Sequence, residues 1–541
     1  MKKSCLYALV IGVVLLQAGC NDDDVDVAIG DSVQNWSRDC GAMADVATQT
    51  EAQLETSRVA AEGDTPAYCQ VSGRINERTG TGPGGRAEDY YTGFVLRMPD
   101  NWNQRFYFQG GGGTDGNQVL DEVQGARAAG EESALARGFA IVATNGGHPQ
   151  NDVSFGFDKQ ARIDYGYNAI EQVAPTAKAL IAEYYGQEPA YSYFVGCSNG
   201  GRQAMQAAQR YPDYFNGIVA GDPGWNLTQA AIGETWNTQQ FAQIAKRDPE
   251  TDMPQLWTAF PPEQGDLEAL SDAILDYCDA ADGISDGMIN RPEACTGFDV
   301  SQVDALSEGQ QQALQAFHEG PPNDVYSSFP WDPGMRGQGW RRWTIGSPGF
   351  NGINAAMGAS SLAAVFTTPP TDPSDPLTYA LNFDFDTDPS ATASASEIID
   401  ADSTHLQAFS RAGHKLIIYQ GMADPVFSAN AIIGYYDRLL DARGGFEKVG
   451  RYARLFRVPG MNHCAGGPAT DQFDMLSAIQ QWVENDQPPE RIRASVDPDN
   501  PEIPSAWEGR SRPLCPYPQF AAYQGSGDRN AAVNFVCETP D

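Results

Sequence analysis

A short glycine-rich segment contains the residue whose chemistry is easiest to recognise. Ser198 lies in the sequence Gly196-Cys197-Ser198-Asn199-Gly200, which follows an apolar run and precedes a helical pattern. A serine at a sharp turn between a strand and a helix is pushed above the sheet, and glycine on either side tolerates the crowding. The N-terminus of the following helix favours negative charge at the serine oxygen. The segment therefore predicts a nucleophilic serine; a solvated serine in an ordinary glycine-rich turn is the alternative.

A serine nucleophile needs a general base, and the chain contains five histidines: His148, His318, His405, His414 and His463. After a nucleophile elbow, the triad partners follow in the order serine, acid, histidine. Asp424 follows the apolar segment 415–420, and His463 follows the apolar segment 454–458. The other four histidines precede this acid. We therefore predict His463 as the general base and then acid, and Asp424 as the carboxylate that orients it; a turn acid with no role is the alternative for Asp424.

Apolar runs alternate with helical patterns in the parts of the chain that would position these residues. Strands are predicted at 92–98, 105–109, 140–144, 191–196, 217–220, 415–420 and 454–458, and helices at 169–185 and 202–211. This alternation is typical of a mostly parallel sheet covered by helices. Together with the serine turn, it predicts the α/β class and an α/β-hydrolase fold.

The alternation stops at about Trp225 and resumes after about Phe409. Between them the chain is rich in Pro, Gly, Asp and Trp and has no clear strand period. We predict a hydrolase core in two parts, 39–225 and 410–541, with a large lid domain, 226–409, inserted between late strands and lying over the strand ends. Within the lid, the Ser-, Thr-, Asp- and Pro-rich stretch 367–396 is predicted to be a surface loop.

The N-terminus predicts export. Residues 1–19 have a basic start, an apolar run too short to span a bilayer, and small residues before Cys20. The site resembles a bacterial lipobox, although Gln17 stands where leucine is usual. We expect a signal peptide at 1–19, lipidation of Cys20 and a flexible tether at 20–38. The protein would be an outer-membrane lipoprotein, or periplasmic or secreted, in a Gram-negative bacterium; cleavage with release is the alternative to lipidation.

The cysteines agree with export. The chain has 10 cysteines, and setting aside Cys5 and Cys20 leaves an even number compatible with disulfides in an oxidising compartment. The sequence alone does not choose among the possible pairings. Nearness along the chain favours Cys40 with Cys69, Cys278 with Cys295, and Cys515 with Cys537, which leaves Cys197 and Cys464 for each other.

The charge balance limits the partners. Lys and Arg number 35 against 71 for Asp and Glu, so the formal net charge is −36. A polyanion of this strength repels phosphate groups, which argues against nucleic acid or anionic lipid as a partner. We therefore expect contact with a membrane only through an N-terminal lipid.

Several segments together resemble the tannase and feruloyl esterase family of α/β-hydrolases. The resemblance runs from about Cys40 to the C-terminus, through 110–116, 146–148, 196–202, 215–221, 461–467 and 514–518. Its most specific feature is a cysteine before the serine and a cysteine after the histidine, Cys197 and Cys464. The resemblance implies a disulfide between these two cysteines and carboxylic ester hydrolysis.

An acyl transfer also needs hydrogen-bond donors for the oxyanion. The elbow rule assigns one donor to the backbone N–H after the nucleophile, here that of Asn199. The second comes from a glycine-rich loop after an early strand, which 110–113 supplies. The family pattern points to Gly113 within that loop.

An acidic segment of the lid, 278–288, places three carboxylates within eight residues. Carboxylates at this density repel one another unless a hard cation such as calcium screens them. The spacing is not that of an EF-hand. Similarity to the family's structural calcium site implies ligation by the side chains of Asp279, Asp282 and Asp286 and the carbonyls of Ile284 and Met288. A solvated acidic turn is the alternative.

Aromatic residues near the predicted site suit an aromatic acyl group. Trp340, Trp343 and Phe350 lie in the lid, and Phe427 follows Asp424. The family resemblance favours Trp343 and Phe427 as pocket walls, although core packing is an alternative for each ring. No Lys or Arg occurs from Trp343 through Ser410. This favours neutral phenolic esters over a terephthalate monoester, unless Arg341, Arg342 or Arg411 binds the free carboxylate.

We therefore predict a calcium-stabilised serine esterase that hydrolyses small or plant-polymer-linked aromatic esters, such as feruloyl or galloyl esters, through an acyl-enzyme. One alternative substrate is a terephthalate monoester. A different class of function is a non-catalytic surface lipoprotein that binds plant polymer or a partner protein. Peptidase activity on the same fold is a weaker alternative.

Overall fold

The computed structural model describes residues 38–372 and 375–540, which belong to one compact unit, Asn35–Asp541. The predicted signal peptide, Cys20 and nearly all of the predicted tether lie outside the described residues. The boundaries predicted between core and lid stay predictions, because this unit is not divided further. No helix of the described part is long and apolar enough to cross a bilayer.

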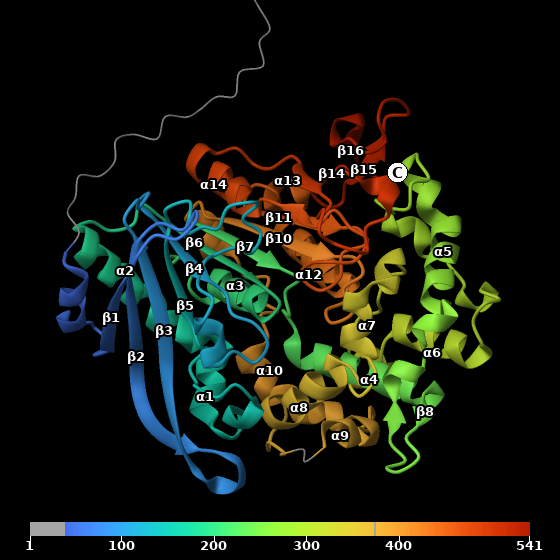
Figure 1. The fold of residues 1–541 in the computed structure, drawn as a ribbon, viewed down its shortest axis with the longest axis horizontal. Helices are drawn as coiled ribbons and strands as arrows, with labels where there is room; N and C mark the ends of the chain where they lie inside the picture. The colour runs from blue at the N-terminus through green and yellow to red at the C-terminus, as the bar shows by residue number, and fades with distance from the viewer. Residues whose placement is uncertain (1–37, 373–374, 541) are drawn as a thin grey trace, which may run out of the picture. The chain divides into compact units, whose positions relative to one another are not determined.

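The described residues form a nine-stranded sheet (Figure 1). Its spatial order is β1 (Gln53–Val59), β2 (Tyr68–Thr81), β3 (Ala87–Pro99), β5 (Ala140–Thr144), β4 (Arg105–Gln109), β6 (Tyr191–Cys197), β7 (Gly217–Gly221), β10 (Lys415–Gly421) and β11 (Ala453–Val458). In this sheet β5, β4, β6, β7, β10 and β11 are parallel to one another. The pairs β1–β2, β2–β3 and β3–β5 are antiparallel. All seven predicted strands are present, as β3, β4, β5, β6, β7, β10 and β11.

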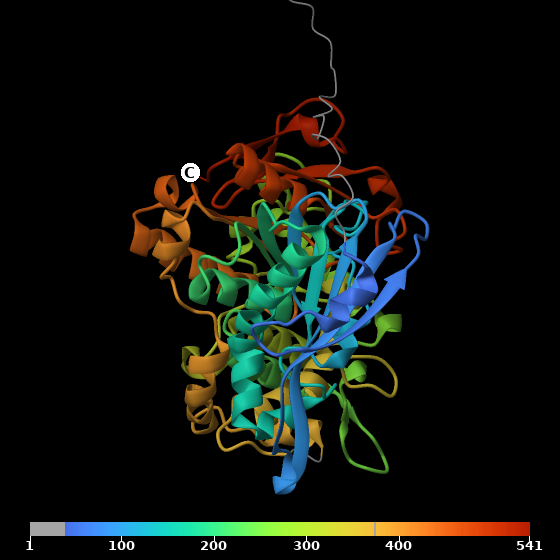
Figure 2. The ribbon, with the colours of Figure 1, turned by 90° about the vertical axis from the view of Figure 1, so that its left-hand side faces the viewer.

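The sequence prediction missed β1, β2 and the first part of β3. These strands pair as antiparallel neighbours, and Figures 1 and 2 both show the β2–β3 hairpin reaching beyond the rest of the sheet. Much of β1 and of the outer half of β2 is exposed, so these strands lack the continuous apolar run that marks a buried parallel strand.

Alternating side chains give the sheet two apolar faces. Phe106, Phe108 and Phe194 lie in the same core cluster as residues of α2 (Ala169–Tyr185) and α3 (Asn199–Arg210). Tyr107 and Tyr193 point to the other face and pack in the cluster that contains residues of α14 (Met475–Asn485). The two-residue period of the strands therefore places one helical layer on each face of the sheet.

The remaining helices of the core are α1 (Lys159–Ile163), α12 (Ala429–Arg443) and α13 (Phe446–Val449). Near the C-terminus, β12 (Gln472–Phe473), β13 (Ile492–Ser495) and β14 (Ser511–Leu514) form a small sheet, and β15 (Phe520–Tyr523) pairs with β16 (Phe535–Glu538). The predicted helix 169–185 is confirmed as α2. The predicted helix 202–211 begins three residues earlier, as α3, because Ser198 occupies its N-cap position.

The lid is the long connection from β7 to β10, which are neighbours in the sheet. Its helices are α4 (Leu227–Ile244), α5 (Asp266–Cys278), α6 (Glu308–Glu319), α7 (Gln338–Thr344), α8 (Ala359–Ser361), α9 (Pro376–Asn382), α10 (Ala393–Ile399) and α11 (Gln407–Arg411), with β8 (Lys246–Arg247) paired to β9 (Pro254–Gln255). The prediction of a surface loop at 367–396 was wrong in part. Helix α9 begins there because the Asp375 side chain accepts a hydrogen bond from Leu377 N and Pro376 fits the first helical turn.

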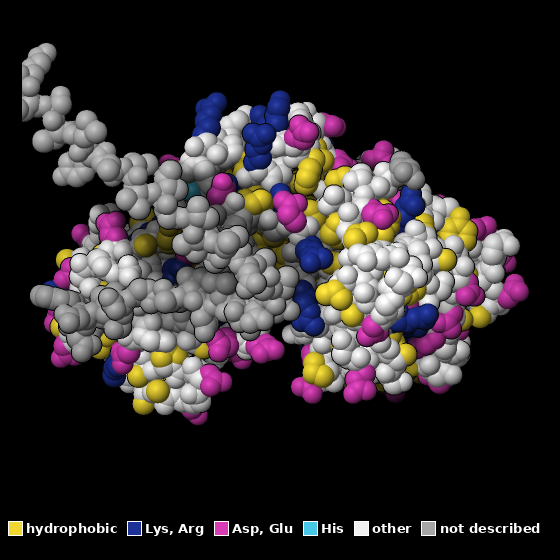
Figure 3. Space-filling view, turned by 90° about the horizontal axis from the view of Figure 1, so that it is seen from above, with side chains coloured by type: hydrophobic (Ala, Val, Ile, Leu, Met, Phe, Trp, Pro, Cys, Tyr) yellow, Lys and Arg dark blue, Asp and Glu magenta, His cyan; other side chains and the backbone are white. Residues whose placement is uncertain are grey.

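The described residues form four disulfides, in the pairing predicted from the sequence: Cys40–Cys69, Cys197–Cys464, Cys278–Cys295 and Cys515–Cys537. On the face seen in Figure 3, acidic side chains are spread among the other residues, with basic side chains between them. The strong negative charge of the chain is therefore not confined to one patch of that face.

Candidate active site

The candidate site lies where four parallel strands end. Ser198 directly follows β6, and Asp222 directly follows β7. Asp424 and His463 lie on the loops after β10 and β11. Because β6, β7, β10 and β11 are neighbours in the sheet, four segments that are far apart in the sequence meet at one edge.

Ser198 adopts the strained conformation that a nucleophile elbow requires. Its φ is 64° and its ψ is −127°, a backbone conformation that residues other than glycine rarely adopt. A Cβ atom on Gly196 would lie 2.4 Å from Gly200 O, and one on Gly200 would lie 2.5 Å from Gly111 O. The two glycines are therefore needed for the close passage of backbone segments around the serine.

Three side chains form a continuous hydrogen-bonded series. His463 Nε2 lies 2.8 Å from Ser198 Oγ, and His463 Nδ1 lies 2.8 Å from Asp424 Oδ2. The structure therefore brings together the three residues that the sequence predicts as a triad. The arrangement lets the imidazole accept the serine proton while the carboxylate stabilises the positive charge that forms on the ring.

The Asp424 carboxylate is held firmly by other groups. Its Oδ1 accepts hydrogen bonds from Val426 N at 2.8 Å and Phe427 N at 3.1 Å, and its Oδ2 accepts one from Gln420 Nε2 at 3.3 Å. The side chain of Asp424 is fully buried, and that of His463 is nearly so. These contacts fix the carboxylate so that one oxygen faces the imidazole.

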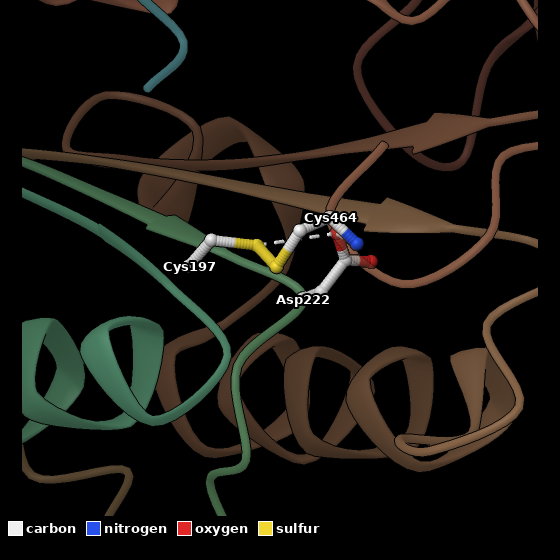
Figure 4. Close-up of side chains that lie close together, drawn as sticks. All are labelled: Cys197, Asp222 and Cys464. Atoms are coloured by element: carbon white, nitrogen blue, oxygen red, sulfur yellow. Dashed lines mark hydrogen bonds between the residues drawn. A yellow bond between two sulfur atoms is a disulfide. The ribbon is translucent and has the colours of Figure 1, made fainter. Parts of the chain in front are cut away.

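The Cys197–Cys464 disulfide joins the residue before Ser198 to the residue after His463, and Asp222 lies beside it (Figure 4). The carboxylate of Asp222 accepts hydrogen bonds from Gly421 N at 2.6 Å and Cys464 N at 3.1 Å. Asp222 therefore connects the start of the loop that holds Asp424 with the loop that holds His463. Because both sulfurs are in a disulfide, this group of side chains is not a thiolate metal site.

Asp222 is fully buried and close to Asp424, and the sequence analysis missed it. Burial is the larger cause that raises the pKa of Asp222 well above its ordinary value, and the negative charge of Asp424 adds to it. Both effects favour the protonated form of the Asp222 carboxyl group. The position of Asp222 directly after a buried strand could have indicated a role in the site. However, many acidic residues at such positions only cap turns.

Both predicted oxyanion donors lie at the serine. Gly113 and Asn199 line the same small cavity as Ser198. Within the described residues, the backbone N–H of neither Gly113 nor Asn199 donates a hydrogen bond to a protein atom. Two free N–H groups beside a nucleophile could stabilise a tetrahedral oxyanion.

A buried polar network connects the glycine-rich loop to α3. Asp115 accepts hydrogen bonds from the Asn199 side chain and from Gln203 Nε2, and Gln203 Oε1 accepts one from Gly111 N at 2.9 Å. Burial raises the pKa of Asp115 to about 7, although the nearby Arg202 guanidinium opposes this shift. The network fixes the position of the loop relative to the serine. Asp115 was not singled out from the sequence, although it lies within the glycine-rich segment 110–116.

The imidazole is flanked by Trp343 and Phe427, the two aromatic residues predicted as pocket walls. The ring centroids of Trp343 and Phe427 lie 5.0 Å and 5.3 Å from that of His463, and both contacts are edge to face. Trp340 is instead buried in the lid core, and Phe350 is an exposed side chain that lines neither of the cavities beside Ser198. Trp343 and Phe427 are therefore placed to contact a substrate, whereas Trp340 and Phe350 are not.

Ser198 stands between two cavities of different character. A wide cleft of about 1000 Å³ has His463, Arg127 and the 109–113 loop among its lining residues. A narrow cavity of about 40 Å³ is lined by Phe427, Met357 and Glu234, and by no Lys or Arg of the described chain. Ser198, Gly113 and Trp343 line both cavities. The three arginines considered from the sequence as binders of a carboxylate, Arg341, Arg342 and Arg411, line neither.

The acidic segment of the lid has features that suit a hard cation. Asp279 Oδ1 and Asp286 Oδ1 are buried and accept no hydrogen bond from a described residue. Asp286 also pairs with Arg512 and, at 3.7 Å, with Arg510. The side-chain oxygens of the three aspartates are not all within 4.8 Å of one another. These oxygens are of the kind that calcium prefers, but the three carboxylates are not gathered around one point in this structure.

The sheet topology and the strained serine turn define the class of the protein: it is an α/β-hydrolase. The family model described as tannase and feruloyl esterase matches residues 77–538. The chain belongs to the tannase and feruloyl esterase family, and it is a carboxylic ester hydrolase.

Individual relatives agree with this assignment. The chain is 40% identical to mono(2-hydroxyethyl) terephthalate hydrolase of Piscinibacter sakaiensis, over 92% of this chain and 89% of that protein. In fold, it is similar to an esterase from Aspergillus oryzae, with a TM-score of 0.72, 21% identity and coverage of 92% of this chain and 99% of that one. Feruloyl esterase B from Aspergillus oryzae gives a TM-score of 0.69, 22% identity and coverage of 92% and 100%.

Proposed function

We propose that the protein hydrolyses esters of aromatic carboxylic acids, such as feruloyl or galloyl esters, through an acyl-enzyme on Ser198. The observation that carries the proposal is the hydrogen-bonded series from Ser198 through His463 to Asp424, with 2.8 Å at each step. Family membership and the aromatic residues beside His463 support the aromatic acyl group.

The proposed reaction has the following steps, which the positions of the three side chains support. His463 Nε2 takes the proton from Ser198 Oγ as Oγ attacks the ester carbonyl carbon. The negative charge that develops on the carbonyl oxygen is stabilised by the N–H groups of Gly113 and Asn199. His463 then gives its proton to the alcohol oxygen as the carbon–oxygen bond breaks, which leaves the acyl group on Ser198. A water molecule then attacks the acyl carbon while His463 takes its proton. His463 returns that proton to Ser198 Oγ as the acyl–serine bond breaks, which releases the carboxylic acid.

The position of His463 indicates which cavity holds the alcohol portion of the ester and which holds the acyl portion. The leaving alcohol must lie near the histidine that protonates it. His463 lines the wide cleft and does not line the narrow cavity. The alcohol portion therefore occupies the wide cleft, where a large sugar or polymer fits, and the acyl ring extends toward the narrow cavity.

A terephthalate monoester is the second candidate substrate. The identity of 40% with mono(2-hydroxyethyl) terephthalate hydrolase favours it. The narrow cavity has no described Lys or Arg to bind the free carboxylate, and burial of an unpaired carboxylate costs several kcal/mol. The phenolic esters are therefore the first candidate.

Calcium and export complete the proposal. A calcium ion held by the side chains of Asp279, Asp282 and Asp286 and the carbonyls of Ile284 and Met288 would stabilise the lid and take no part in the reaction. Four disulfides suit an oxidising compartment. We propose export of the protein, with lipid on Cys20 as its only attachment to a membrane and no nucleic acid partner.

A serine-reactive fluorophosphonate probe tests the enzymatic proposal. Wild-type protein should be labelled, and Ser198→Ala should not be labelled while it keeps the wild-type circular dichroism spectrum. Wild-type protein should also hydrolyse methyl ferulate or methyl gallate, with at least about a 10⁴-fold loss in Ser198→Ala. A wild-type protein that neither reacts with the probe nor hydrolyses these esters would refute the proposed hydrolysis of aromatic esters through Ser198.

A further inference from the structure

The narrow cavity beside Ser198 contains a carboxyl group that the reaction does not use. Glu234 lies on α4 in the lid, is 5% exposed, and lines this cavity together with Phe427 and Met357. Its side chain makes no hydrogen bond or ion pair with another described residue. Buried carboxyl groups normally have a partner, so this one points to a group that the bound substrate would supply.

The backbone leaves space for this carboxyl. A Cβ atom on Gly358 would lie 1.9 Å from Glu234 Oε2, so a larger residue at position 358 would displace the carboxyl. Met357 precedes Gly358. A Cβ atom added to Gly113 would lie 3.5 Å from the sulfur of Met357, so this side chain lies close to Gly113. Glu234 therefore lies in the wall of a cavity that Gly113, from the proposed oxyanion loop, and the proposed nucleophile Ser198 also line.

The charge state of Glu234 determines which ligand it suits. Burial raises the pKa of Glu234 well above its ordinary value, and the negative charge of Asp424 acts in the same direction. The cavity contains no described Lys or Arg that would oppose this. A neutral carboxyl group both donates and accepts a hydrogen bond, which matches a neutral hydroxyl group. A carboxylate on the ligand would enter a cavity that no described Lys or Arg lines and that lies near the negative charge of Asp424.

We propose that Glu234 selects the acyl group by hydrogen-bonding a hydroxyl group on the aromatic ring of the substrate. Esters of hydroxylated aromatic acids are hydrolysed in preference to esters whose ring has no hydroxyl group or has a carboxylate. This inference rests on the proposed function, because it places the acyl ring in the narrow cavity. That cavity, of about 40 Å³, is small beside the ~300–1000 Å³ of typical ligand pockets, so the proposal requires lining side chains such as Met357 to move aside when a ring binds.

A matched pair of substrates tests the inference. Methyl 4-hydroxycinnamate and methyl cinnamate differ only by the hydroxyl group. The wild-type enzyme should have a kcat/KM for the hydroxylated ester at least about tenfold higher, because methyl cinnamate leaves the buried carboxyl without a partner. In Glu234→Leu, the ratio should fall to within about threefold of one. Glu234→Gln, which keeps a donor and an acceptor, should keep most of the preference.

Two further measurements complete the design. Glu268→Leu, at an exposed position of the lid helix α5, is the matched control and should keep the wild-type ratio. Glu234→Met provides a second apolar variant if the leucine variant does not fold by circular dichroism. A preference that survives in Glu234→Leu or Glu234→Met, or a wild-type ratio near one, would overturn the role of Glu234. Absence of ester hydrolysis and of probe labelling in the wild type would instead refute the proposed function, so the two failures are distinguishable.

Discussion

Cys197 and Cys464 are 267 positions apart in the sequence, yet their Cα atoms lie 6.1 Å apart in a disulfide. The bond joins the backbone beside Ser198 to the backbone beside His463. It therefore constrains the separation of Ser198 and His463, between which the proposed reaction transfers a proton, in addition to closing a long loop of the chain.

Removal of this disulfide should affect catalysis as well as stability. We expect Cys197→Ala with Cys464→Ala to lower the free energy of unfolding by about 2–4 kcal/mol. We also expect kcat to fall at least tenfold at a temperature where the variant is folded, because displacement of reacting groups by about 1 Å can cost 10²-fold. Denaturant unfolding and steady-state kinetics measure the two effects.

The matched control for this variant is Cys515→Ala with Cys537→Ala, which removes the disulfide between the end of β14 and β16. It should lose stability and keep kcat. If both double variants keep the wild-type kcat, the Cys197–Cys464 bond supports only the fold.

Asp424→Asn tests the orienting role of the carboxylate. The amide of the variant is neutral, so whichever of its atoms faces His463 Nδ1, it would not stabilise the imidazolium as the carboxylate does. We therefore expect kcat to fall by about 10⁴-fold while the protein remains folded. Asp441→Asn, at an exposed position of α12, should have wild-type kinetics. A loss below tenfold in Asp424→Asn would mean that another acid orients the histidine.

Asp222 should make stability depend on pH with a definite sign. Because the pKa of Asp222 is raised in the folded protein, the folded state keeps a proton that the unfolded chain loses above about pH 4. The free energy of unfolding should therefore decrease as the pH rises from 5 to 8. Asp222→Asn, which resembles the protonated form and does not titrate, should lack this contribution, so its stability relative to the wild type should rise with pH.

Denaturant unfolding at pH 5, 6.5 and 8 measures this difference. Asp222→Ala is the companion variant, because it removes the acceptors of Gly421 N and Cys464 N and should lower both stability and kcat. A constant difference between the wild type and Asp222→Asn across this pH range would show that Asp222 is ionised in the folded protein.

Removal of calcium should destabilise the protein without changing the chemistry at Ser198. We expect a chelator to lower the Tm of the purified protein by a few degrees, and added calcium to restore it, because a ligand that binds only the folded state stabilises it. Differential scanning calorimetry measures the shift.

Asp279→Asn should lose the response to calcium, whereas Asp304→Asn, at an exposed position of the same lid, should keep it. Equal Tm values for the wild type with chelator and with calcium would mean that the acidic segment is neutralised by Arg510 and Arg512 alone.

Some of these features were readable from the sequence because they are local. The elbow around Ser198 requires glycine at fixed neighbouring positions, and a parallel strand buried on both faces is a continuous apolar run, so both leave a pattern within a few residues. The strands β1 and β2 have no such run and were missed. Helix α9 was missed because its signal is one capping residue followed by proline.

The amino-acid sequence was enough to predict the fold class, the order of serine, acid and histidine along the chain, and the cysteines available to pair. Three features became visible only once the chain was folded: Asp222 connects the loops of Asp424 and His463, Asp115 holds the glycine-rich loop, and Glu234 lines the narrow cavity beside Ser198. The physical reason is that a buried polar side chain takes its role from partners brought to it by packing. Those partners come from strands and helices distant in the chain, and their identity is not encoded near the residue itself.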